Sequence, residues 1–219
     1  MEIREIFNGV YRINGKLATE NLARGTKVYD EDLISAEDRE YRTWNPYRSK
    51  LAASILKSMK NMEIREGSNV LYLGAATGTT CSHISDIIKS EGSLYCVEFS
   101  ERNMRQLLDV CEKRENMFPI FKDARKVEEY AENVGTVDIL YQDLSAKDQA
   151  DLLLLNGGLL KRGGYAYVAI KSQSISVSKP PKQVYREFFN KVSTKFQLLE
   201  SIDIMPFDRM HMFAVFKKK

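Results

Sequence analysis

The stretch from Asn69 to Phe99 restricts the fold more than any other part of this chain. It reads N-V-L-Y-L-G-A-A-T-G-T-T-C-S-H-I-S-D-I-I-K-S-E-G-S-L-Y-C-V-E-F. An apolar run leads into a glycine turn that opens a helix, and a second apolar run ends on Glu98. In α/β folds this order forms a nucleoside pocket, because the turn approaches the ligand closely and the carboxylate accepts both ribose hydroxyls. We therefore predict a nucleoside-binding turn in this segment.

The glycines of the turn indicate which nucleoside it takes. A dinucleotide fold needs glycine at all three places of G-x-G-x-x-G, where this chain has Gly74, Ala76 and Thr79. A Walker loop is excluded, since no Gly-Lys-Ser/Thr follows Gly78. The pattern favours an adenosine ligand without phosphates, above all S-adenosylmethionine. A tight strand-to-helix turn that binds no ligand is the alternative.

Strands and helices alternate from residue 46 to the end of the chain, which predicts an α/β fold with a doubly wound, mostly parallel sheet. Only Met205–Met210 separates the last two expected strands, and so short a turn requires antiparallel pairing. Six parallel strands and one antiparallel strand are the layout of a class I S-adenosylmethionine-dependent methyltransferase, a Rossmann-like seven-stranded sheet. The expected strands are Val70–Leu73, Leu94–Glu98, Phe118–Phe121, Val137–Tyr141, Tyr165–Ile170, Leu198–Ile204 and His211–Phe216. The expected helices are Thr79–Lys89, Glu101–Arg114, Val127–Asn133, Asp148–Leu160 and Pro181–Lys195, preceded by one whose apolar face runs from Leu51 to Met62.

Residues 1–45 have a different pattern. Asn14-Gly15 lies between the β-prone pieces Val10–Ile13 and Lys16–Thr19, and Asn-Gly between such pieces is a strong hairpin signal. We therefore expect a small N-terminal antiparallel β-sheet over residues 1–45, followed by a methyltransferase domain over residues 46–219.

Charge and cysteine content exclude several classes of protein. The 33 basic and 30 acidic residues leave a net charge of +3, which is too balanced for a dedicated nucleic-acid binder. Cys81, Cys96 and Cys111 form no C-x-x-C pair, and neither His83 nor His211 lies at zinc-ligand spacing from them. We expect no metal and no disulfide. A charged N-terminus and the lack of a membrane-length apolar run predict a cytosolic protein without membrane contact.

Polar side chains follow four of the expected strands. Glu98 ends the second strand, Asp123 and Asp143 lie two residues beyond the third and fourth, and Lys171 directly follows the fifth. Ligands of open α/β sheets bind beyond these carboxyl ends, so Asp123 is placed to meet an adenine amino group. Asp143 and Lys171 end neighbouring strands and are expected to face each other. A lysine beside a carboxylate suits a hydroxyl nucleophile, which must lose a proton during methyl transfer. An N-cap or a surface ion pair is the alternative for each of these residues.

Several strings of this sequence resemble fibrillarin in its archaeal form. Two are highly specific together: Trp44-Asn45-Pro46-Tyr47-Arg48-Ser49-Lys50-Leu51-Ala52-Ala53 and Leu73-Gly74-Ala75-Ala76-Thr77-Gly78-Thr79-Thr80. The resemblance continues through Gly15–Thr19, Val97–Ser100, Asp123–Arg125, Tyr141–Asp143, Ile170-Lys171 and Asp208–His211, so it covers most of the chain. The chain departs from the usual family pattern at Leu144–Lys147, at Ser172–Ser176 and around His211.

This resemblance implies ribose 2′-O-methylation of RNA, both rRNA and tRNA, with S-adenosylmethionine as the methyl donor. It implies Lys171 as the main proton-handling group, Asp143 as the residue that orients it, and Lys50 and His211 as residues that position the target ribose. The cofactor contacts implied, beyond Gly74 and Gly78, are Thr79, Thr80, Glu98, Phe99, Asp123, Ala124, Asp143, Leu144, Ser145 and Ala146.

The resemblance further implies partners. They are a Nop5-type scaffold protein, a box C/D guide RNA with its target RNA, and a kink-turn-binding ribosomal-type protein. Three other functions stay open at this point. A nucleotide-linked dehydrogenase is opposed by Ala76 and Thr79, and a free-standing small-molecule O-methyltransferase is opposed by the Trp44–Lys50 string. A structural subunit that binds the cofactor without turnover is compatible with the altered loop at Leu144–Ala146.

Overall fold

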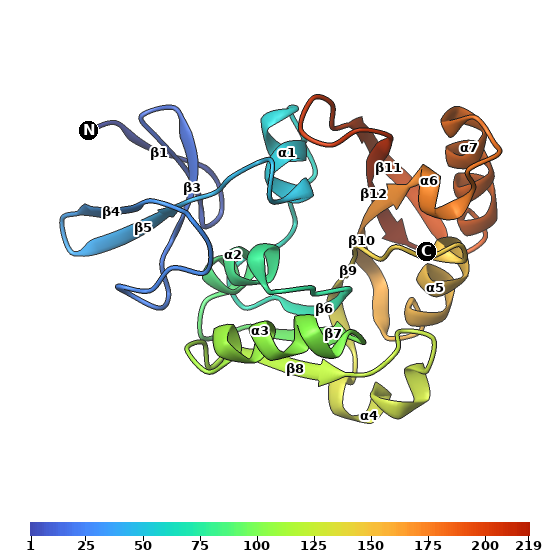
Figure 1. The fold of residues 1–219 in the computed structure, drawn as a ribbon, viewed down its shortest axis with the longest axis horizontal. Helices are drawn as coiled ribbons and strands as arrows, with labels where there is room; N and C mark the ends of the chain where they lie inside the picture. Colours follow the sequence, from blue (N-terminus) through green and yellow to red (C-terminus); the bar gives the residue numbers. More distant parts are fainter.

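The computed structural model describes residues 1–219 and contains two β-sheets (Figure 1). The N-terminal sheet has five antiparallel strands in the order β1-β2-β3-β5-β4. The second sheet has seven strands in the order β11-β12-β10-β9-β6-β7-β8. The strands of the first sheet are β1 (Ile3–Phe7), β2 (Val10–Ile13), β3 (Lys16–Glu20), β4 (Leu33–Ala36) and β5 (Arg39–Thr43). Those of the second are β6 (Asn69–Leu73), β7 (Ser93–Glu98), β8 (Met117–Phe121), β9 (Val137–Gln142), β10 (Leu160–Lys171), β11 (Phe196–Asp203) and β12 (His211–Lys218).

The predicted N-terminal hairpin is present. Ile13 of β2 pairs with Lys16 of β3, and the two turn residues Asn14 and Gly15 have φ angles of 46° and 85°. Left-handed backbone at both positions matches the twist of the flanking strands, and it is the reason Asn-Gly is preferred there. The prediction of a small antiparallel sheet is therefore confirmed.

The large sheet has the predicted class I methyltransferase layout. Strands β10, β9, β6, β7 and β8 pair in parallel, whereas β12 runs antiparallel between β10 and β11. The connection after β11 is too short to carry a crossover helix, so the chain must reverse and pair with β11 directly. The predicted antiparallel last strand is confirmed.

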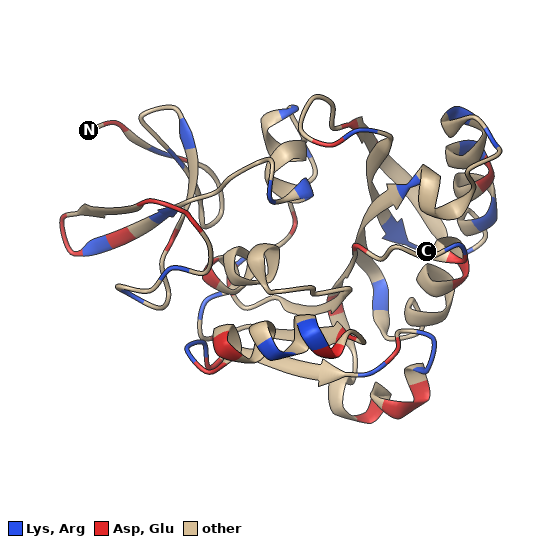
Figure 2. Cartoon of the chain, in the orientation of Figure 1, with Lys and Arg blue, Asp and Glu red and all other residues tan.

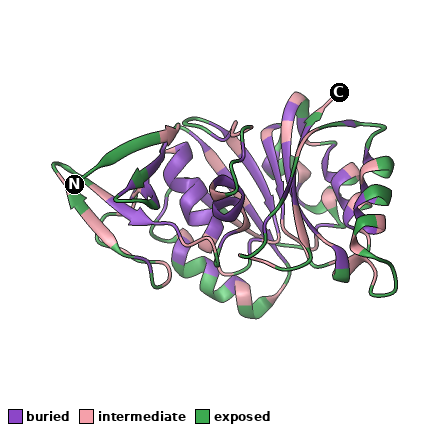
Figure 3. Cartoon of the chain, turned by 90° about the horizontal axis from the view of Figure 1, so that it is seen from above, coloured by how far each residue is buried: buried purple, intermediate pink, exposed green.

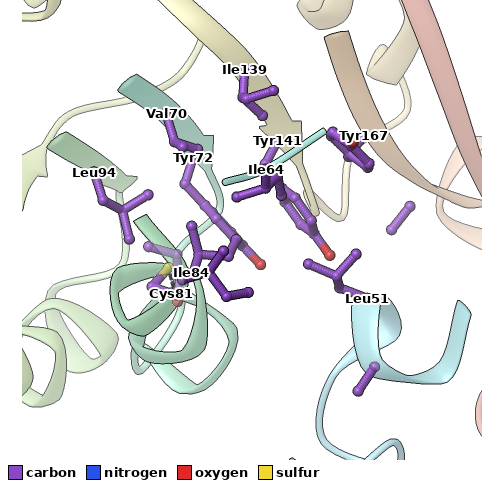
Figure 4. Packing of buried hydrophobic residues seen from close by; sticks show 14 of the residues in the cluster. Leu51, Ile64, Val70, Tyr72, Cys81, Ile84, Leu94, Ile139, Tyr141 and Tyr167 are labelled. Carbon is purple, nitrogen blue, oxygen red and sulfur yellow. Dashed lines mark hydrogen bonds between the residues drawn. The ribbon is translucent and has the colours of Figure 1, made fainter. Parts of the chain in front are cut away.

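Helices cover both faces of this sheet because its strands are apolar on both sides. Along β6, Val70 and Tyr72 pack on one face and Leu71 and Leu73 on the other, as the two-residue period of a strand requires. Figure 4 shows the first face, where Tyr72 and Ile84 lie close together in the core. On this face pack α1 (Lys50–Leu56), α2 (Thr79–Ile88) and α3 (Glu101–Cys111). On the other pack α4 (Ala131–Val134), α5 (Gln149–Asn156) and α7 (Pro181–Val192), with a single 3-10 turn η1 (Val127–Glu129) and the short α6 (Ser172–Ile175) nearby.

Five helix predictions were wrong in extent. Two helices end three residues early, α3 at Cys111 and α7 at Val192. The first helix ends at Leu56, followed closely by Ser58 with a left-handed φ of 68°. The helix expected over Val127–Asn133 is broken into η1 and α4, and α4 stops before Gly135. The helix expected to reach Leu160 ends at Asn156, because glycines follow and Leu160 already pairs with Val137 in the sheet.

A buried polar network joins the N-terminal sheet to α2. Arg42 of β5 has no exposed surface, and its Nε lies 3.1 Å from Oδ2 of Asp86 while its Nη1 lies 3.2 Å from Oε1 of Glu31. These two nitrogens are at ion-pair distance without hydrogen-bond alignment, but Nη2 donates to Ser82 at 2.8 Å. Arg114 contacts Asp86 Oδ1 at 2.6 Å. In Figure 3 the buried residues continue from the large sheet into the N-terminal sheet, whose outer strand β1 is exposed. The N-terminal sheet is therefore joined to the methyltransferase unit through a buried interface with α2.

His83 lies inside this network and is fully buried. Its Nδ1 lies 2.7 Å from the Thr19 hydroxyl and its Nε2 lies 2.7 Å from the Tyr29 hydroxyl. Its ring stacks on Trp44 with 4.7 Å between ring centres. Burial, reinforced by the charges of Arg42 and Arg114, holds the pKa of His83 well below its usual value.

We expect acid to destabilise the protein through His83. The pKa of His83 in the folded protein lies below the unfolded value of 6.5. Below pH 6.5, His83 therefore binds a proton in the unfolded chain but stays neutral in the folded protein. The free energy of unfolding should fall with a slope of up to about 1.4 kcal/mol per pH unit from this residue alone. Urea unfolding of the wild type and of His83→Gln at pH 7.5, 6.5 and 5.5 measures it. The variant should show the shallower slope, and equal slopes would contradict the assignment.

Candidate active site

Asp143 and Lys171 meet at the carboxyl edge of the large sheet, as predicted. Asp143 directly follows β9 and Lys171 is the last residue of β10, and these strands are neighbours. The Lys171 Nζ lies 2.8 Å from Asp143 Oδ1 and donates to the Asp143 carbonyl oxygen at 3.0 Å and to the Ser145 hydroxyl at 3.1 Å. The ammonium group is thus surrounded by three oxygens.

Lys50 reaches the same carboxylate from α1. Ser49 caps this helix, since its hydroxyl accepts the Ala52 backbone N–H, and Lys50 is the first helical residue. Lys50 Nζ lies 3.1 Å from Asp143 Oδ1 and donates to Oδ2 at 3.2 Å, a contact between residues 93 positions apart. Two lysines therefore share one mostly buried aspartate.

Asp208 and His211 complete the cluster. Asp208 Oδ2 lies 2.7 Å from His211 Nδ1 and 3.7 Å from Lys50 Nζ. The contact with His211 is short but lies off the direction of a ring N–H, so the two groups approach closely without hydrogen-bond alignment. His211 is the first residue of β12 and sits directly opposite Lys171 in the ladder. The side chains form a continuous series of contacts in space, from Lys171 through Asp143, Lys50 and Asp208 to His211.

The surroundings move the pKa values of two of these groups. Burial raises the pKa of Asp143, but the two adjacent lysines outweigh it and hold that pKa below its usual value. Burial lowers the pKa of His211, and Lys50 and Lys171 lower it further against the opposing effect of Asp208. Asp143 is therefore an anion at neutral pH, and His211 is a neutral imidazole.

The glycine turn lies directly against this cluster. Gly74 has a φ of 82°, and a Cβ at this position would lie 2.8 Å from the Asp143 carbonyl oxygen. Gly78, with a φ of 88°, faces Leu107 of α3 in the same way, at 3.1 Å. Both glycines are thus required by protein backbone conformation and packing. Gly74 allows the nucleoside turn to lie against the loop after β9, and Gly78 allows it to lie against α3.

Glu98 ends β7 next to this turn. Its Oε2 accepts the Ala76 backbone N–H at 2.8 Å and its Oε1 accepts the Ser100 N–H at 2.8 Å. A carboxylate has about four acceptor positions, so both oxygens retain capacity for further donors. A group anchored in this way at the end of the second parallel strand suits the two hydroxyls of a ribose.

The other residues predicted to contact a nucleoside lie around the same turn and edge. Phe99 is 69% exposed. Asp123 Oδ1 accepts the backbone N–H and a guanidinium N–H of Arg125. Ala124 is buried, and its carbonyl accepts from Asn156 and Tyr130. Thr79 and Thr80 open α2, where the Thr80 hydroxyl donates to Ser49, and Leu144, Ser145 and Ala146 follow Asp143 in its loop.

The fibrillarin family model matches residues 1–219. This chain belongs to the fibrillarin family. The fibrillarin-like rRNA/tRNA 2′-O-methyltransferase of Methanocaldococcus jannaschii is 43% identical over 222 residues, covering 98% of this chain and 96% of that protein. A fibrillarin structure from Aeropyrum pernix with natively bound S-adenosyl-L-methionine is 40% identical, with a TM-score of 0.89 and coverage of 98% and 99% of the two chains. A chain of a fibrillarin/Nop5p complex is 33% identical, with a TM-score of 0.91 and coverage of 99% and 100%.

Membership of the fibrillarin family confirms the resemblance seen in the sequence. The structure brings the four expected catalytic side chains, Lys50, Asp143, Lys171 and His211, into one cluster beside the glycine turn. Sequence reasoning did not assign a role to Asp208, which bridges two of them. Its spacing of three residues from His211 was the available signal, but those residues lie in an irregular turn where spacing alone does not fix the geometry. No helix has the length and apolar character needed to cross a membrane.

Proposed function

We propose that this chain is an S-adenosylmethionine-dependent RNA ribose 2′-O-methyltransferase, the catalytic subunit of a box C/D guide-RNA particle that modifies rRNA and tRNA. The observation that carries the proposal is the cluster of Lys50, Asp143 and Lys171 at the sheet edge, in contact with a nucleoside turn. The named activity of the Methanocaldococcus jannaschii relative and the cofactor in the Aeropyrum pernix structure support it. We keep the division into an N-terminal unit of residues 1–45 and a methyltransferase unit of residues 46–219.

The residues of the glycine turn fit S-adenosylmethionine. Glu98 would hold the ribose hydroxyls, Asp123 and Ala124 would flank the adenine, and the Asp143–Ala146 loop would lie beside the sulfonium end. Gly74, Gly78, Thr79, Thr80 and Phe99 would form the rest of the cradle. The cofactor supplies an electrophilic methyl group that needs little further activation. The protein must therefore align the acceptor hydroxyl and remove its proton.

The contacts favour Lys171 as a fixed cation. Its ammonium group donates hydrogen bonds to the Asp143 carbonyl oxygen and the Ser145 hydroxyl, and it lies 2.8 Å from Asp143 Oδ1, at ion-pair distance without hydrogen-bond alignment. These contacts fix the position of the lysine and keep the Asp143 loop in place. Lys50, held between two carboxylates, likewise presents a positive charge toward a bound ribose. We propose that both lysines stabilise the oxygen as negative charge develops on it.

His211 is the better proton acceptor of this cluster. Its lowered pKa keeps the ring neutral at physiological pH, and Asp208 lies at Nδ1, which leaves Nε2 for the substrate. We propose that Nε2 takes the proton of the target 2′-hydroxyl while Asp208 orients the ring. The sequence resemblance implied Lys171 for this step, and the variants described below distinguish the two assignments.

The proposed partners follow from the same family. A scaffold protein of the Nop5 type is supported by the fibrillarin/Nop5p complex. The guide and target RNA and a kink-turn-binding protein are proposed because a net charge of +3 provides little general affinity for RNA. In such a particle the guide would select the target nucleotide. A cytosolic location is consistent with three free thiols.

The direct test is methyl transfer from labelled S-adenosylmethionine to a guided RNA duplex, with and without the reconstituted partners. Ribose methylation by the wild type that is lost in Lys171→Ala would support the proposal. Lys191→Ala, which removes an exposed lysine paired with Asp151, is the matched control and should retain full activity. Tight cofactor binding without transfer in a competent particle would instead favour a structural subunit without turnover.

The role of His211 predicts a pH profile. Methylation should fall in acid as His211 gains a proton, with an apparent pKa below 6.5. Asp208 raises that pKa, so Asp208→Asn should move the acid limb to lower pH and reduce the plateau about 10- to 100-fold through loss of orientation. The measurement is single-turnover methylation from pH 5 to 8, with Asp208→Glu as the conservative control. An acid limb that does not move, or moves upward, would rule out this arrangement.

A further inference from the structure

An open groove with a volume of about 490 Å³ lies beside His211 and has no role in the site described so far. The start of α7, the end of β11 and the start of β12 enclose it. Its lining includes Pro181, Tyr185, Met205, Met210 and Met212, and His211 forms part of its wall. The catalytic cluster and this groove therefore share the side chain of His211.

The lining is apolar but open to solvent. Met205 and Met210 are 48% and 42% exposed, whereas Tyr185 is nearly buried. Exposed large apolar side chains that gather at one place usually mark a binding surface. Methionine is suited to this, because its flexible thioether adapts to a partner and makes favourable contacts with aromatic rings.

The rim of the same groove carries positive charge. Lys182 lines it, and Arg209 precedes Met210 on the opposite side. Neither forms an ion pair, in contrast to the neighbouring Lys179, which pairs with Glu187. The one carboxylate in the lining, Asp203, already accepts the Met205 backbone N–H at 3.0 Å. Figure 2 shows further basic positions along α7, at the upper right.

We propose that this groove binds the RNA nucleotide next to the target ribose on the substrate strand. A nucleotide combines the flat face of a base with an anionic phosphate. The methionines of the groove can contact the base, and Lys182 at the rim can pair with the phosphate. Because His211 faces both sites, a strand whose 2′-hydroxyl lies at Nε2 continues directly into the groove. The inference rests on the proposed RNA methylation and adds the surface that places the strand.

The first test separates binding from chemistry. The double variant Met205→Ala/Met210→Ala should raise the KM for guided target RNA about 10-fold and leave kcat within about twofold, because the methionines contact the strand outside the reacting atoms. Cofactor affinity should not change. Leu155→Ala, which removes an equally exposed apolar side chain on α5, is the matched control. Lys182→Ala should reduce the dependence of RNA affinity on log salt by about one.

The second test identifies which part of the RNA enters the groove. Target RNAs with an abasic nucleotide on one or the other side of the target ribose are methylated by the wild type and by the double methionine variant. On the side whose base enters the groove, the abasic change should weaken RNA binding by the wild type. The same change should have little further effect on the double methionine variant, because that variant has already lost the contacts with the base. Loss of pairing with the guide affects both enzymes equally and cancels in this comparison.

Distinct outcomes would overturn the inference. Two results would show that no nucleotide occupies the groove. In the first, the double methionine variant has the same KM for target RNA as Leu155→Ala. In the second, each abasic change weakens RNA binding by the same factor in the wild type and in the variant. Methionine variants that weaken capture of the scaffold protein and leave RNA affinity unchanged would assign the groove to a protein. RNA affinity is measured directly in the same particles. A wild type that binds the RNA through the groove but never methylates it would contradict the proposed function while leaving the groove assignment intact.

Discussion

Asp143→Asn should reduce methyl transfer by at least about 1,000-fold, the largest effect expected for a conservative change in this protein. The carboxylate is the common partner of Lys50 and Lys171, at 3.1 and 2.8 Å. A neutral amide leaves two ammonium groups close together with only Asp208, 3.7 Å from Lys50, to compensate them, so both lysine side chains and the loop after β9 should move. Single-turnover methylation of guided RNA measures the loss.

Cofactor binding and folding must be measured beside that loss. Calorimetric titration with S-adenosylmethionine and thermal unfolding show whether the variant still folds and binds. Asp148→Asn is the control, since Asp148 lies nearby but pairs with Arg125 at the exposed surface. Activity within tenfold of the wild type in Asp143→Asn would remove the two-lysine cluster from the proposed chemistry.

Asp86→Ala should lower the free energy of unfolding by about 3–5 kcal/mol. The Asp86 carboxylate is fully buried and lies 2.6 Å from Arg114, 3.1 Å from Arg42 and 2.7 Å from the Thr19 hydroxyl, and it accepts the Leu22 backbone N–H at 3.0 Å. Alanine leaves two buried guanidinium groups with only Glu31, the remaining partner of Arg42, to balance them, so Arg114 loses its carboxylate. Urea unfolding at neutral pH measures the change.

The same variant should loosen the N-terminal sheet, because Thr19, Leu22 and Arg42 all belong to it or to its loops. Limited proteolysis should cut within residues 1–45 faster than in the wild type. Asp151→Ala, which removes an exposed ion pair with Lys191, should change stability by less than about 1 kcal/mol. Equal stability of the two variants would mean that the buried network does not hold the sheets together.

Much of the fold could be predicted because it depends on local patterns. Asn14-Gly15 specifies a left-handed turn by itself, and the continuous apolar run Val70–Leu73 predicts a strand that is covered by helices on both faces. The helix ends were less predictable. The helix expected to reach Leu160 stops at Asn156 because that leucine is needed in the sheet against Val137, a partner that no local pattern names.

The site divides in the same way. Asp143 and Lys171 were placed together from sequence because the carboxyl ends of neighbouring parallel strands meet at one edge. Lys50 and His211 entered only through the family resemblance, since a helix-start lysine and an edge-strand histidine are common on any surface. Asp208 was missed, because its contact with both depends on how the turn before β12 folds back onto α1.

The sequence by itself determined the two-sheet architecture, the nucleoside turn and its preference for S-adenosylmethionine. Each depends on the order of residues within one segment, where backbone conformation and side-chain alternation act over short range. Only the tertiary structure decided that the two glycines accommodate protein atoms, that His83 is a buried neutral group, and that one carboxylate holds two lysines. These features depend on side chains far apart in the chain, and their electrostatics arise only after burial has removed water from around them.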